Sequence, residues 1–231
     1  MDLIKVSDHL AQKIPKLCLS YIHFNGITVQ KQASSTLNEY GLEVMDKIKK
    51  TYTLEALRNN EIIRKYRDFY WHYLNIDPTK TRPSSEALTR RMLANKPIPK
   101  INDIVDLNNW VSIETLVPLG AYDLDCLKIP LVLRFANKRE GFIPIGGSKK
   151  KMKGNEIILA DDNGLIIHEY PHRDSEISKI TFKTKNILIV ACGVPGIKHQ
   201  ILEDALNIFR NILKKIAKNQ MFYSEITTLS S

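Results

Sequence analysis

Two adjacent residues, Arg173 and Asp174, are the best candidates for chemistry in this sequence. They follow a turn at Pro171 and a strand-like apolar run, so they should lie where a strand crosses a pocket. A guanidinium and a carboxylate in such a place can fix a substrate's carboxylate, amine or ribose hydroxyl. The alternative is a surface ion pair, which is common and contributes little to stability.

Polar side chains also interrupt a helical pattern. Apolar residues recur at helical spacing after Asn102, a suitable N-cap, and predict a largely apolar helix within INDIVDLNNWVSIETL, residues 101–116. Four residues break this pattern: Asp106, Asn108, Asn109 and Ser112. Because a buried polar group costs free energy unless it is hydrogen-bonded, these side chains either line a cavity or bond to neighbouring backbone.

The segment before this helix begins with a turn. Pro78 and Pro83 fix their own backbone angles and disfavour helix at the preceding residues, so this stretch should separate two helices. Ser84 or Ser85 is the expected N-cap of the second helix, with Glu86 in its first turn. Its core-facing residues are predicted to be Leu88, Met92 and Leu93.

Two clusters of basic residues could contact a polyanion. Between Thr79 and Lys100 there are six basic residues against one acid, and the predicted RNA contacts among them are Lys80, Arg82, Arg90 and Arg91. The second cluster lies in a glycine-flanked loop and comprises Lys149, Lys150, Lys151 and Lys153. This loop is either simply solvated or a further contact to an RNA backbone.

The remaining pattern is that of a scaffold. Short β-rich runs after Ile129, a strand at about residues 20–30 and a hairpin turn at residues 161–164 predict the sheet. A long helix is expected at residues 54–73, with aromatic side chains interpreted as core rather than as a base-stacking surface. A covering helix is expected at about residues 198–219, and residues 221–231 carry no strong signal.

These elements predict the fold class α/β (α+β), an antiparallel-rich sheet covered by helices. The expected organisation is one domain over residues 1–231. Its parts are an N-terminal strand with helices (1–76), a polar helical segment (77–128), the sheet (129–194) and the covering helix (198–219).

Charge and composition narrow the partners. The formal net charge of +9 favours a polyanion. No signal-peptide pattern and no apolar run of membrane-spanning length is present, so no membrane partner is expected. Three isolated cysteines without C-x-x-C spacing indicate a reducing cytosol, and the expected location is cytoplasmic.

Other chemical signatures are absent from the sequence. Neither a phosphate-binding G-x-x-x-x-G-K-[ST] nor a G-x-G-x-x-G motif occurs, so no cofactor is predicted. His168 and His172 lie at a strand and the following loop, a spacing not expected to bring both rings to one face, and no metal site is predicted. Cys192 is interpreted as a small buried hydrophobe rather than a catalytic thiol.

Several separated motifs together resemble a known family. They are DPTKTRPSSEALTRRML, PKINDIVDLNNWVS, PLGAYDLD, GNEIILADDNGLI and HRDSEISKITFKTKNILIV, and the resemblance that includes them covers roughly residues 20–194. The set resembles the B3/B4 domain, the tRNA-editing module of the bacterial phenylalanyl-tRNA synthetase beta subunit, which also occurs as free-standing proteins. The resemblance implies tRNA as the partner. Because no adenylation core is present, it implies an accessory module and not a full synthetase.

The resemblance also suggests site residues. The synthetase module has an editing histidine in the segment matching PLGAYD, where this chain has Gly120, and its acidic residue matches either Asp174 or Glu176. A glycine at this position is expected to open space for a larger substrate or for the RNA end. The predicted catalytic residues are Asp174, Asn109 and Arg173, and the predicted substrate-binding residues are Asn108, Asn109, Ser112, Pro118, Gly120, Asp123 and Glu176.

Three functions are consistent with these patterns. The first is a hydrolase that removes the amino acid from mischarged tRNA in trans, with Asn109 hydrogen-bonding the amino acid and Asp174 orienting a water or binding the α-amine. The second is a non-catalytic RNA-binding module, and the third is a protein that binds a small amino-acid-like molecule. The synthetase-embedded form of the family removes tyrosine from tRNA for phenylalanine, which makes this substrate a natural probe.

Overall fold

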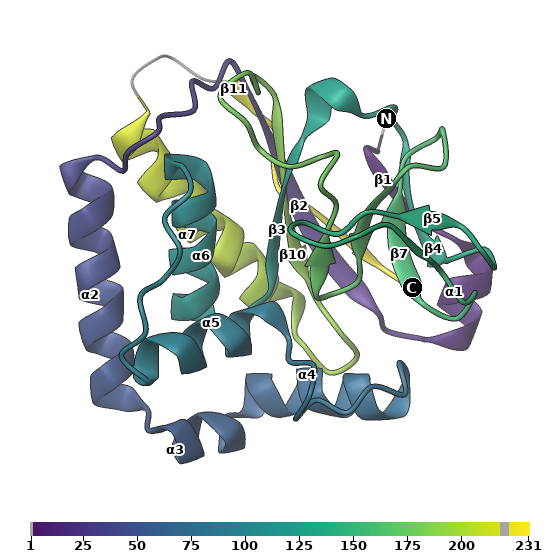
Figure 1. Ribbon diagram of the computed structural model, residues 1–231, viewed down its shortest axis with the longest axis horizontal. Helices are drawn as coiled ribbons and strands as arrows, with labels where there is room; N and C mark the ends of the chain where they lie inside the picture. Colours follow the sequence, from purple (N-terminus) through teal and green to yellow (C-terminus); the bar gives the residue numbers. More distant parts are fainter. Residues whose placement is uncertain (1, 218–221) are drawn as a thin grey trace.

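The computed structural model describes residues 2–217 and 222–231. Within these residues the strands form two larger sheets and one small two-stranded sheet. Most of the helices gather beside the sheet that contains β2, β3 and β10, and the sheet that contains β4 and β7 lies on the opposite side (Figure 1). The fold class predicted from the sequence, an antiparallel-rich α/β assembly covered by helices, is confirmed.

The first sheet has the strand order β1-β4-β7-β8-β9. Its strands are β1 (Ile4–Val6), β4 (Leu131–Phe135), β7 (Ile157–Ala160), β8 (Ile166–Glu169) and β9 (Arg173–Asp174). β1 runs parallel to β4, and the other pairs are antiparallel. The predicted hairpin turn joins β7 to β8, where Gly164 has a positive φ of 81° that favours glycine.

The second sheet has the order β11-β2-β10-β3 and is antiparallel throughout. Its strands are β2 (Cys18–Asn25), β3 (Leu119–Asp123), β10 (Ile187–Cys192), β11 (Phe222–Tyr223) and β12 (Thr227–Ser230), which also pairs with β2. The small third sheet consists of β5 (Gly141–Phe142) and β6 (Lys150–Lys151). Residues 221–231, which carry no strong sequence signal, thus contribute two edge strands where they are described.

The helices are α1 (Asp8–Lys13), α2 (Ser35–Thr51), α3 (Leu54–Asn59), α4 (Glu61–His72), α5 (Ser84–Leu93), α6 (Asp103–Thr115) and α7 (His199–Ile216), with a short 3₁₀ turn η1 (Leu124–Cys126). α6 and α7 pack against each other and against the second sheet (Figure 1). α7 covers this sheet with an apolar face, as predicted. The last two residues of its predicted range, 218 and 219, lie outside the described residues.

The single predicted sheet of residues 129–194 is in fact divided between two sheets. All six residues of β10 are buried, so both faces of this strand need cover. Its edges pair with β2 and β3, so β10 is a central strand of the second sheet rather than a member of the first, and α7 packs against it. The division matters for function, because it places β10 and β8 in different sheets.

Two helix predictions need correction. The long helix predicted over residues 54–73 breaks at Asn60, which ends α3 and caps α4 by accepting hydrogen bonds from the backbone N–H groups of Ile62 and Ile63. Neither Ser84 nor Ser85 caps α5, whose N-cap position is Pro83. Ser85 is buried instead, and its hydroxyl donates to the carbonyl of Leu116 at 2.8 Å. This bond ties the start of α5 to the end of α6.

Candidate functional site

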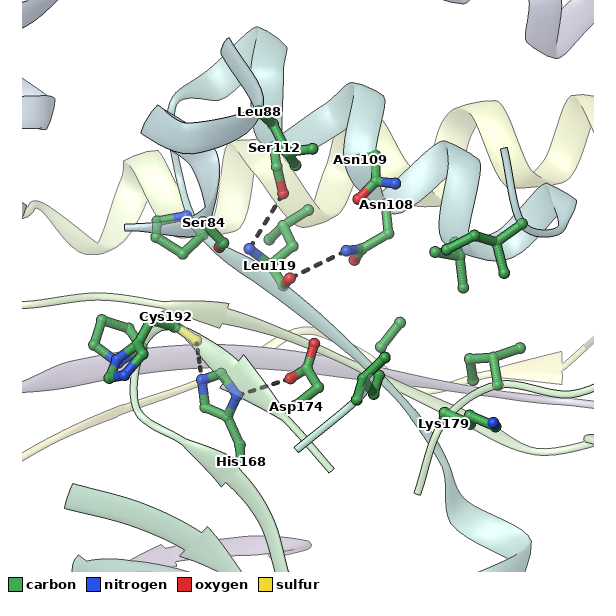
Figure 2. Close-up of a pocket in the computed structure, with 18 residues that line it drawn as sticks. Ser84, Leu88, Asn108, Asn109, Ser112, Leu119, His168, Asp174, Lys179 and Cys192 are labelled. Carbon is green, nitrogen blue, oxygen red and sulfur yellow. Dashed lines mark hydrogen bonds and ion pairs between the residues drawn. The ribbon is translucent and has the colours of Figure 1, made fainter. Parts of the chain in front are cut away.

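A cavity of about 170 Å³ lies between the helices α5 and α6 and the strands β3, β8, β9 and β10. Figure 2 shows its two sides, with Ser84, Leu88, Asn108, Asn109 and Ser112 on the helical side. We call this side the helical wall. The opposite side, which we call the strand wall, carries His168, Asp174 and Cys192 (Figure 2). Apolar residues fill most of the remaining lining, among them Val105, Leu119, Ala121, Ile145 and Ile180.

The polar residues of the helical wall both line the cavity and bond to backbone. Asn108 donates through Nδ2 to the carbonyl of Leu119 at 3.1 Å, and the Ser112 hydroxyl accepts from the N–H of Leu119 at 3.2 Å. These two bonds attach α6 to the start of β3. Both alternatives posed by the sequence therefore hold for Asn108 and Ser112, whereas Asp106 lies away from this cavity and accepts from the N–H of Ile101.

Two polar side chains of the helical wall have hydrogen-bonding groups available for a ligand. Asn108 is buried, and its Oδ1 has no hydrogen-bond partner among the described residues. A buried acceptor without a partner is uncommon in native proteins. Asn109 is half-buried and lines the cavity, and its side chain makes no hydrogen bond within the described residues. Each can therefore bind a polar group of a molecule that enters the cavity.

The strand wall holds a chain of hydrogen-bonding side chains. Asp174 Oδ1 accepts a hydrogen bond from the Tyr122 hydroxyl at 2.8 Å and lies 2.7 Å from Nδ1 of His168. The second ring nitrogen of His168, Nε2, lies 3.7 Å from Sγ of Cys192. The contact to the carboxylate assigns the ring proton to Nδ1, which leaves Nε2 able to accept a proton. Figure 2 shows this line from Cys192 through His168 to Asp174.

Burial keeps the Cys192 thiol and the Tyr122 phenol of the strand wall neutral. Cys192 and Tyr122 are fully buried, and burial raises the pKa of the Cys192 thiol well above its ordinary value, with a further contribution from the charge of Asp174. Burial and the charge of Asp174 likewise raise the pKa of Tyr122 well above its ordinary value. Both groups therefore carry their protons at neutral pH. The Asp174 side chain is one-third exposed, so this end of the hydrogen-bonded row of side chains lies at the mouth of the cavity.

His172 also lines the cavity, so the expectation that it would not share a face with His168 is wrong. Burial, and to a smaller extent the charges of neighbouring groups, lower the pKa of His172 to about 3. Its Nε2 lies 3.7 Å from Glu169, while Nδ1 is buried without a hydrogen-bond partner. The ring is therefore neutral at physiological pH. Among the described residues, no group of three or more His, Cys, Asp or Glu side chains is placed to hold a metal ion.

Of the predicted site residues, four do not line the cavity: Gly120, Asp123, Glu176 and Arg173. Gly120 cannot open space for a substrate, because a Cβ atom there would lie 2.0 Å from the Tyr122 hydroxyl oxygen, whose ring fills that space. Its neighbour Ala121, on the opposite face of β3, lines the cavity instead. Asp123 accepts from Thr184 at 2.6 Å and caps η1. Glu176 forms an ion pair with Lys179. By contrast, five of the predicted site residues line the cavity: Pro118, Asn108, Asn109, Ser112 and Asp174.

A wider groove of about 640 Å³ adjoins the cavity and shares residues with it. The shared polar residues are Ser84, Asn109, His172 and Asp174. The groove is also lined by basic side chains: Lys80, Arg82, Arg91 and Arg173. Arg173 therefore faces the groove rather than the cavity. The groove thus presents positive charge directly beside the polar end of the cavity.

Some of the predicted RNA-binding side chains already have carboxylate partners. Glu86 is fully buried, and its Oε1 lies 2.8 Å from Arg67, 3.9 Å from Arg82 and 3.7 Å from Arg90. A buried carboxylate needs such compensation. In the loop, Lys150 donates two hydrogen bonds to the buried Glu169. Lys149, Lys151 and Lys153 are exposed. The groove therefore contains charges of two kinds, those held by Glu86 and those available to a ligand.

His168, Tyr122 and Cys192 were not predicted as site residues from the sequence. His168 and Cys192 lie within apolar runs that read as buried strands, LIIHEY and NILIVAC. A histidine in such a run is one available signal, since a buried imidazole needs hydrogen-bond partners. Its partners, however, come from β9 and β10, and no local spacing brings them together.

The fold and the site together define an α/β protein with a small polar-ended cavity that opens beside a basic groove. The chain belongs to the B3/4 domain family, whose model matches residues 65–218. No helix among the described residues is long and apolar enough to cross a membrane. The cysteines Cys18, Cys126 and Cys192 are free thiols.

The relatives found by comparison are beta subunits of phenylalanine–tRNA ligase. The Tropheryma whipplei protein is 34% identical over 101 residues, covering 44% of this chain and 10% of its own length. The Fusobacterium nucleatum protein is 35% identical over 91 residues, covering 39% of this chain and 11% of its own length. The match therefore covers about a tenth of these curated relatives.

A solved structure confirms the fold. An N-terminal fragment of the phenylalanyl-tRNA synthetase beta subunit from Pyrococcus horikoshii aligns with 96% of this chain and 53% of its own length. The TM-score is 0.51 and the sequence identity is 15%. At this identity the likeness supports the fold and not the identity of individual site residues.

Proposed function

We propose that this chain binds aminoacyl-tRNA and acts in trans as an editing deacylase, with residues 1–231 working as one domain. The observation that supports this proposal is the junction between the small cavity and the basic groove, which share Asn109, His172 and Asp174. An aminoacyl-tRNA has the same two parts, a single amino acid joined by an ester to a polyanionic chain. The ester would lie where the cavity and the groove meet.

The cavity suits the amino-acid part of this substrate. Its lining is mainly apolar, with hydrogen-bonding groups concentrated on the helical and strand walls. Figure 2 shows the second carboxylate oxygen of Asp174 directed toward the helical wall, and this oxygen makes no hydrogen bond within the described residues. It can therefore accept from the α-ammonium group. Asn109, which is also free of protein partners there, can bind the amino acid from the other side.

The groove suits the phosphate backbone at the end of the tRNA. Lys80, Arg91 and Arg173 line it and none of the three has a carboxylate partner within 4 Å among the described residues. Phosphate contacts supply most of the sequence-independent affinity of proteins for nucleic acids. The relatives' own names state a ligase that joins phenylalanine to tRNA, which supports tRNA as the polyanion.

A deacylation assay tests the catalytic part of the proposal. The full chain is incubated with tRNA for phenylalanine charged with labelled tyrosine, and then with a panel of other mischarged tRNAs. Release of the amino acid faster than the spontaneous rate from at least one of them is expected. If the chain binds these tRNAs but accelerates no release, it is a non-catalytic binding module. If it binds none of them, the tRNA proposal itself is wrong.

A salt titration tests the groove. Replacing Lys80, Arg91 and Arg173 by alanine should lower the slope of log affinity against log salt by about 2 to 3, because each lost phosphate contact changes the slope by about 0.7–0.9. The matched control replaces three exposed loop lysines, Lys149, Lys151 and Lys153, and removes the same charge. It should change the slope by less than about 1. The reverse pattern would place the RNA surface on the loop.

A further inference from the structure

Three side chains of the strand wall form a line that the proposed function does not by itself require. Cys192 comes from β10, His168 from β8 and Asp174 from β9. Sγ of Cys192 lies 3.7 Å from Nε2 of His168, and Nδ1 of His168 lies 2.7 Å from Asp174 Oδ1. All three side chains line the cavity. A thiol, an imidazole and a carboxylate in this order are the parts of a nucleophile with its base and the group that orients the base.

We propose that Cys192 is the nucleophile of this site, that His168 is its general base, and that Asp174 orients His168. The inference rests on the proposed function, since it gives the ester cleavage a covalent route through a thioester. It assigns to Cys192 a role opposite to the one that its sequence context indicates.

The orientation of the imidazole favours the thiol over a water as the group that loses a proton. Nδ1 is engaged by Asp174, so only Nε2 can accept a proton, and Nε2 faces Sγ. A base acts on the group within reach of its free nitrogen. The Tyr122 hydroxyl bonds to the same carboxylate oxygen and holds Asp174 in this position. Gly120 makes that bond possible, because any side chain there would displace the Tyr122 ring.

The burial of the thiol decides how it would be activated. Cys192 has 0% of its surface exposed to solvent, although its side chain forms part of the cavity wall. Its raised pKa keeps it protonated at rest, so it is not a standing thiolate–imidazolium pair. The thiol must therefore be deprotonated by His168 as the substrate's carbonyl carbon arrives. A protonated, shielded thiol is also poorly reactive toward oxidants, since the thiolate is the reactive form.

The reaction balances without any added reagent. His168 Nε2 takes the thiol proton as Sγ attacks the ester carbonyl, and the ester C–O bond breaks as that proton passes to the ribose oxygen. The amino acid is then held as a thioester on Cys192, and the tRNA leaves. Water attacks the thioester with His168 as base, the C–S bond breaks, and Sγ regains its proton. The products are free amino acid and uncharged tRNA.

The chain supplies a matched control in Cys18. This cysteine is also buried, and burial raises its pKa to about 11. Its Sγ contacts the carbonyl of Ile197 at 3.8 Å and has no imidazole beside it among the described residues. Cys18 and Cys192 thus share burial and protonation and differ in the presence of His168. A nucleophilic role predicts different outcomes for the two, whereas a packing role predicts similar ones.

The test uses the full chain and tRNA for phenylalanine charged with labelled tyrosine, quenched in acid during turnover. Wild type and Cys18→Ala should carry label that neutral hydroxylamine releases, and Cys192→Ala should carry none. Deacylation by Cys192→Ala should fall by a factor of about 10² or more. Cys192→Ser, which differs by one atom, guards against misfolding and should also lack the hydroxylamine-labile label. Deacylation by Cys192→Ala within about threefold of wild type, with no label on wild type, would overturn the thiol route.

A second probe separates this inference from the proposed function. If wild type deacylates no tRNA, p-nitrophenyl acetate replaces the tRNA and mass spectrometry locates the acetylated cysteines. Acetylation of Cys192 and not of Cys18, slowed at least about tenfold by His168→Gln, would support the triad even though the tRNA proposal had failed. The exposed Cys126 reports the reactivity of an ordinary thiol in the same sample. Absence of acetylation at Cys192 would contradict the triad.

Discussion

The two walls of the cavity use their polar groups differently. On the helical wall, Asn108 and Ser112 form hydrogen bonds with the backbone of Leu119 and thereby fix α6 to β3. On the strand wall, His168 and Asp174 bond to each other, and the second ring nitrogen of His168 faces the thiol of Cys192. The helical wall therefore mainly holds the cavity in shape, and the strand wall carries the groups that can move a proton. Polar residues that line one pocket therefore need not share one kind of role.

The largest expected effect comes from the strand wall. Replacing Asp174 by Asn removes the charge that orients and stabilises His168, and deacylation should fall by a factor of about 10² or more. Single-turnover deacylation of the mischarged tRNA measures it. The control is Asp162→Asn, an exposed carboxylate in the turn between β7 and β8, which should stay within about twofold of wild type. Full activity in the Asp174 variant would remove the strand wall from the chemistry.

A second prediction concerns His172, which lines the cavity beside the proton-moving groups. Its folded pKa of about 3 lies below the ordinary value of 6.5, so between these pH values the unfolded chain binds a proton that the folded chain does not. The contribution of His172 to the free energy of unfolding is therefore fully present above pH 6.5 and is lost progressively as the pH falls toward 3. From pH 6.5 to 4.5 the loss should be about 2 to 3 kcal/mol.

Urea denaturation of wild type and His172→Gln at both pH values isolates this effect. The glutamine variant should lose less stability than wild type over the same interval. His23, whose pKa is also lowered by burial, is present in both proteins and cancels in the comparison. Equal losses in the two proteins would show that His172 titrates in the folded state as it does in the unfolded chain.

The smallest expected effect comes from the helical wall. Ser112→Ala removes the acceptor for the N–H of Leu119 and should lower the free energy of unfolding by about 1 kcal/mol. Deacylation should change by less than about threefold, because the hydroxyl is already bonded to backbone. Ser148→Ala, in the exposed loop, controls for the loss of a hydroxyl and should alter neither quantity. A large loss of activity with unchanged stability would give the helical wall a chemical role.

The same contrast explains what could be predicted from the sequence. Asn108, Asn109 and Ser112 stand out because they interrupt an apolar helix, and the Asn102 cap that begins this helix is confirmed. The fold class and its antiparallel strands follow from short apolar runs between turn residues. These are local patterns, in which the residue and its structural context lie within one turn or one strand.

The strand wall could not be predicted in this way, because its contacts join distant segments. Tyr122 and Asp174 are separated by 52 residues, and Cys192 and His168 by 24. His168 and Cys192 lie in apolar runs that predict core, whereas Asp174 is predicted as a site residue because it follows the turn at Pro171. The misplacement of Gly120 has the same origin, since the ring that fills its space belongs to Tyr122 on the same strand and is held there by Asp174 from another sheet. Only the paired sheets bring these residues together.

The division of the strands into two sheets has a consequence for control of the site. His168 and Asp174 belong to the first sheet, and Cys192 and Tyr122 belong to the second. The line of side chains is thus complete only when the two sheets are docked, and a misplacement of about 1 Å at a reacting group can reduce a rate by about 10²-fold. A substrate bound in the cavity would contact both sheets at once and would add its binding energy to their association. Catalytic activity therefore depends on the relative position of the two sheets. A small shift between them should abolish activity before the protein unfolds.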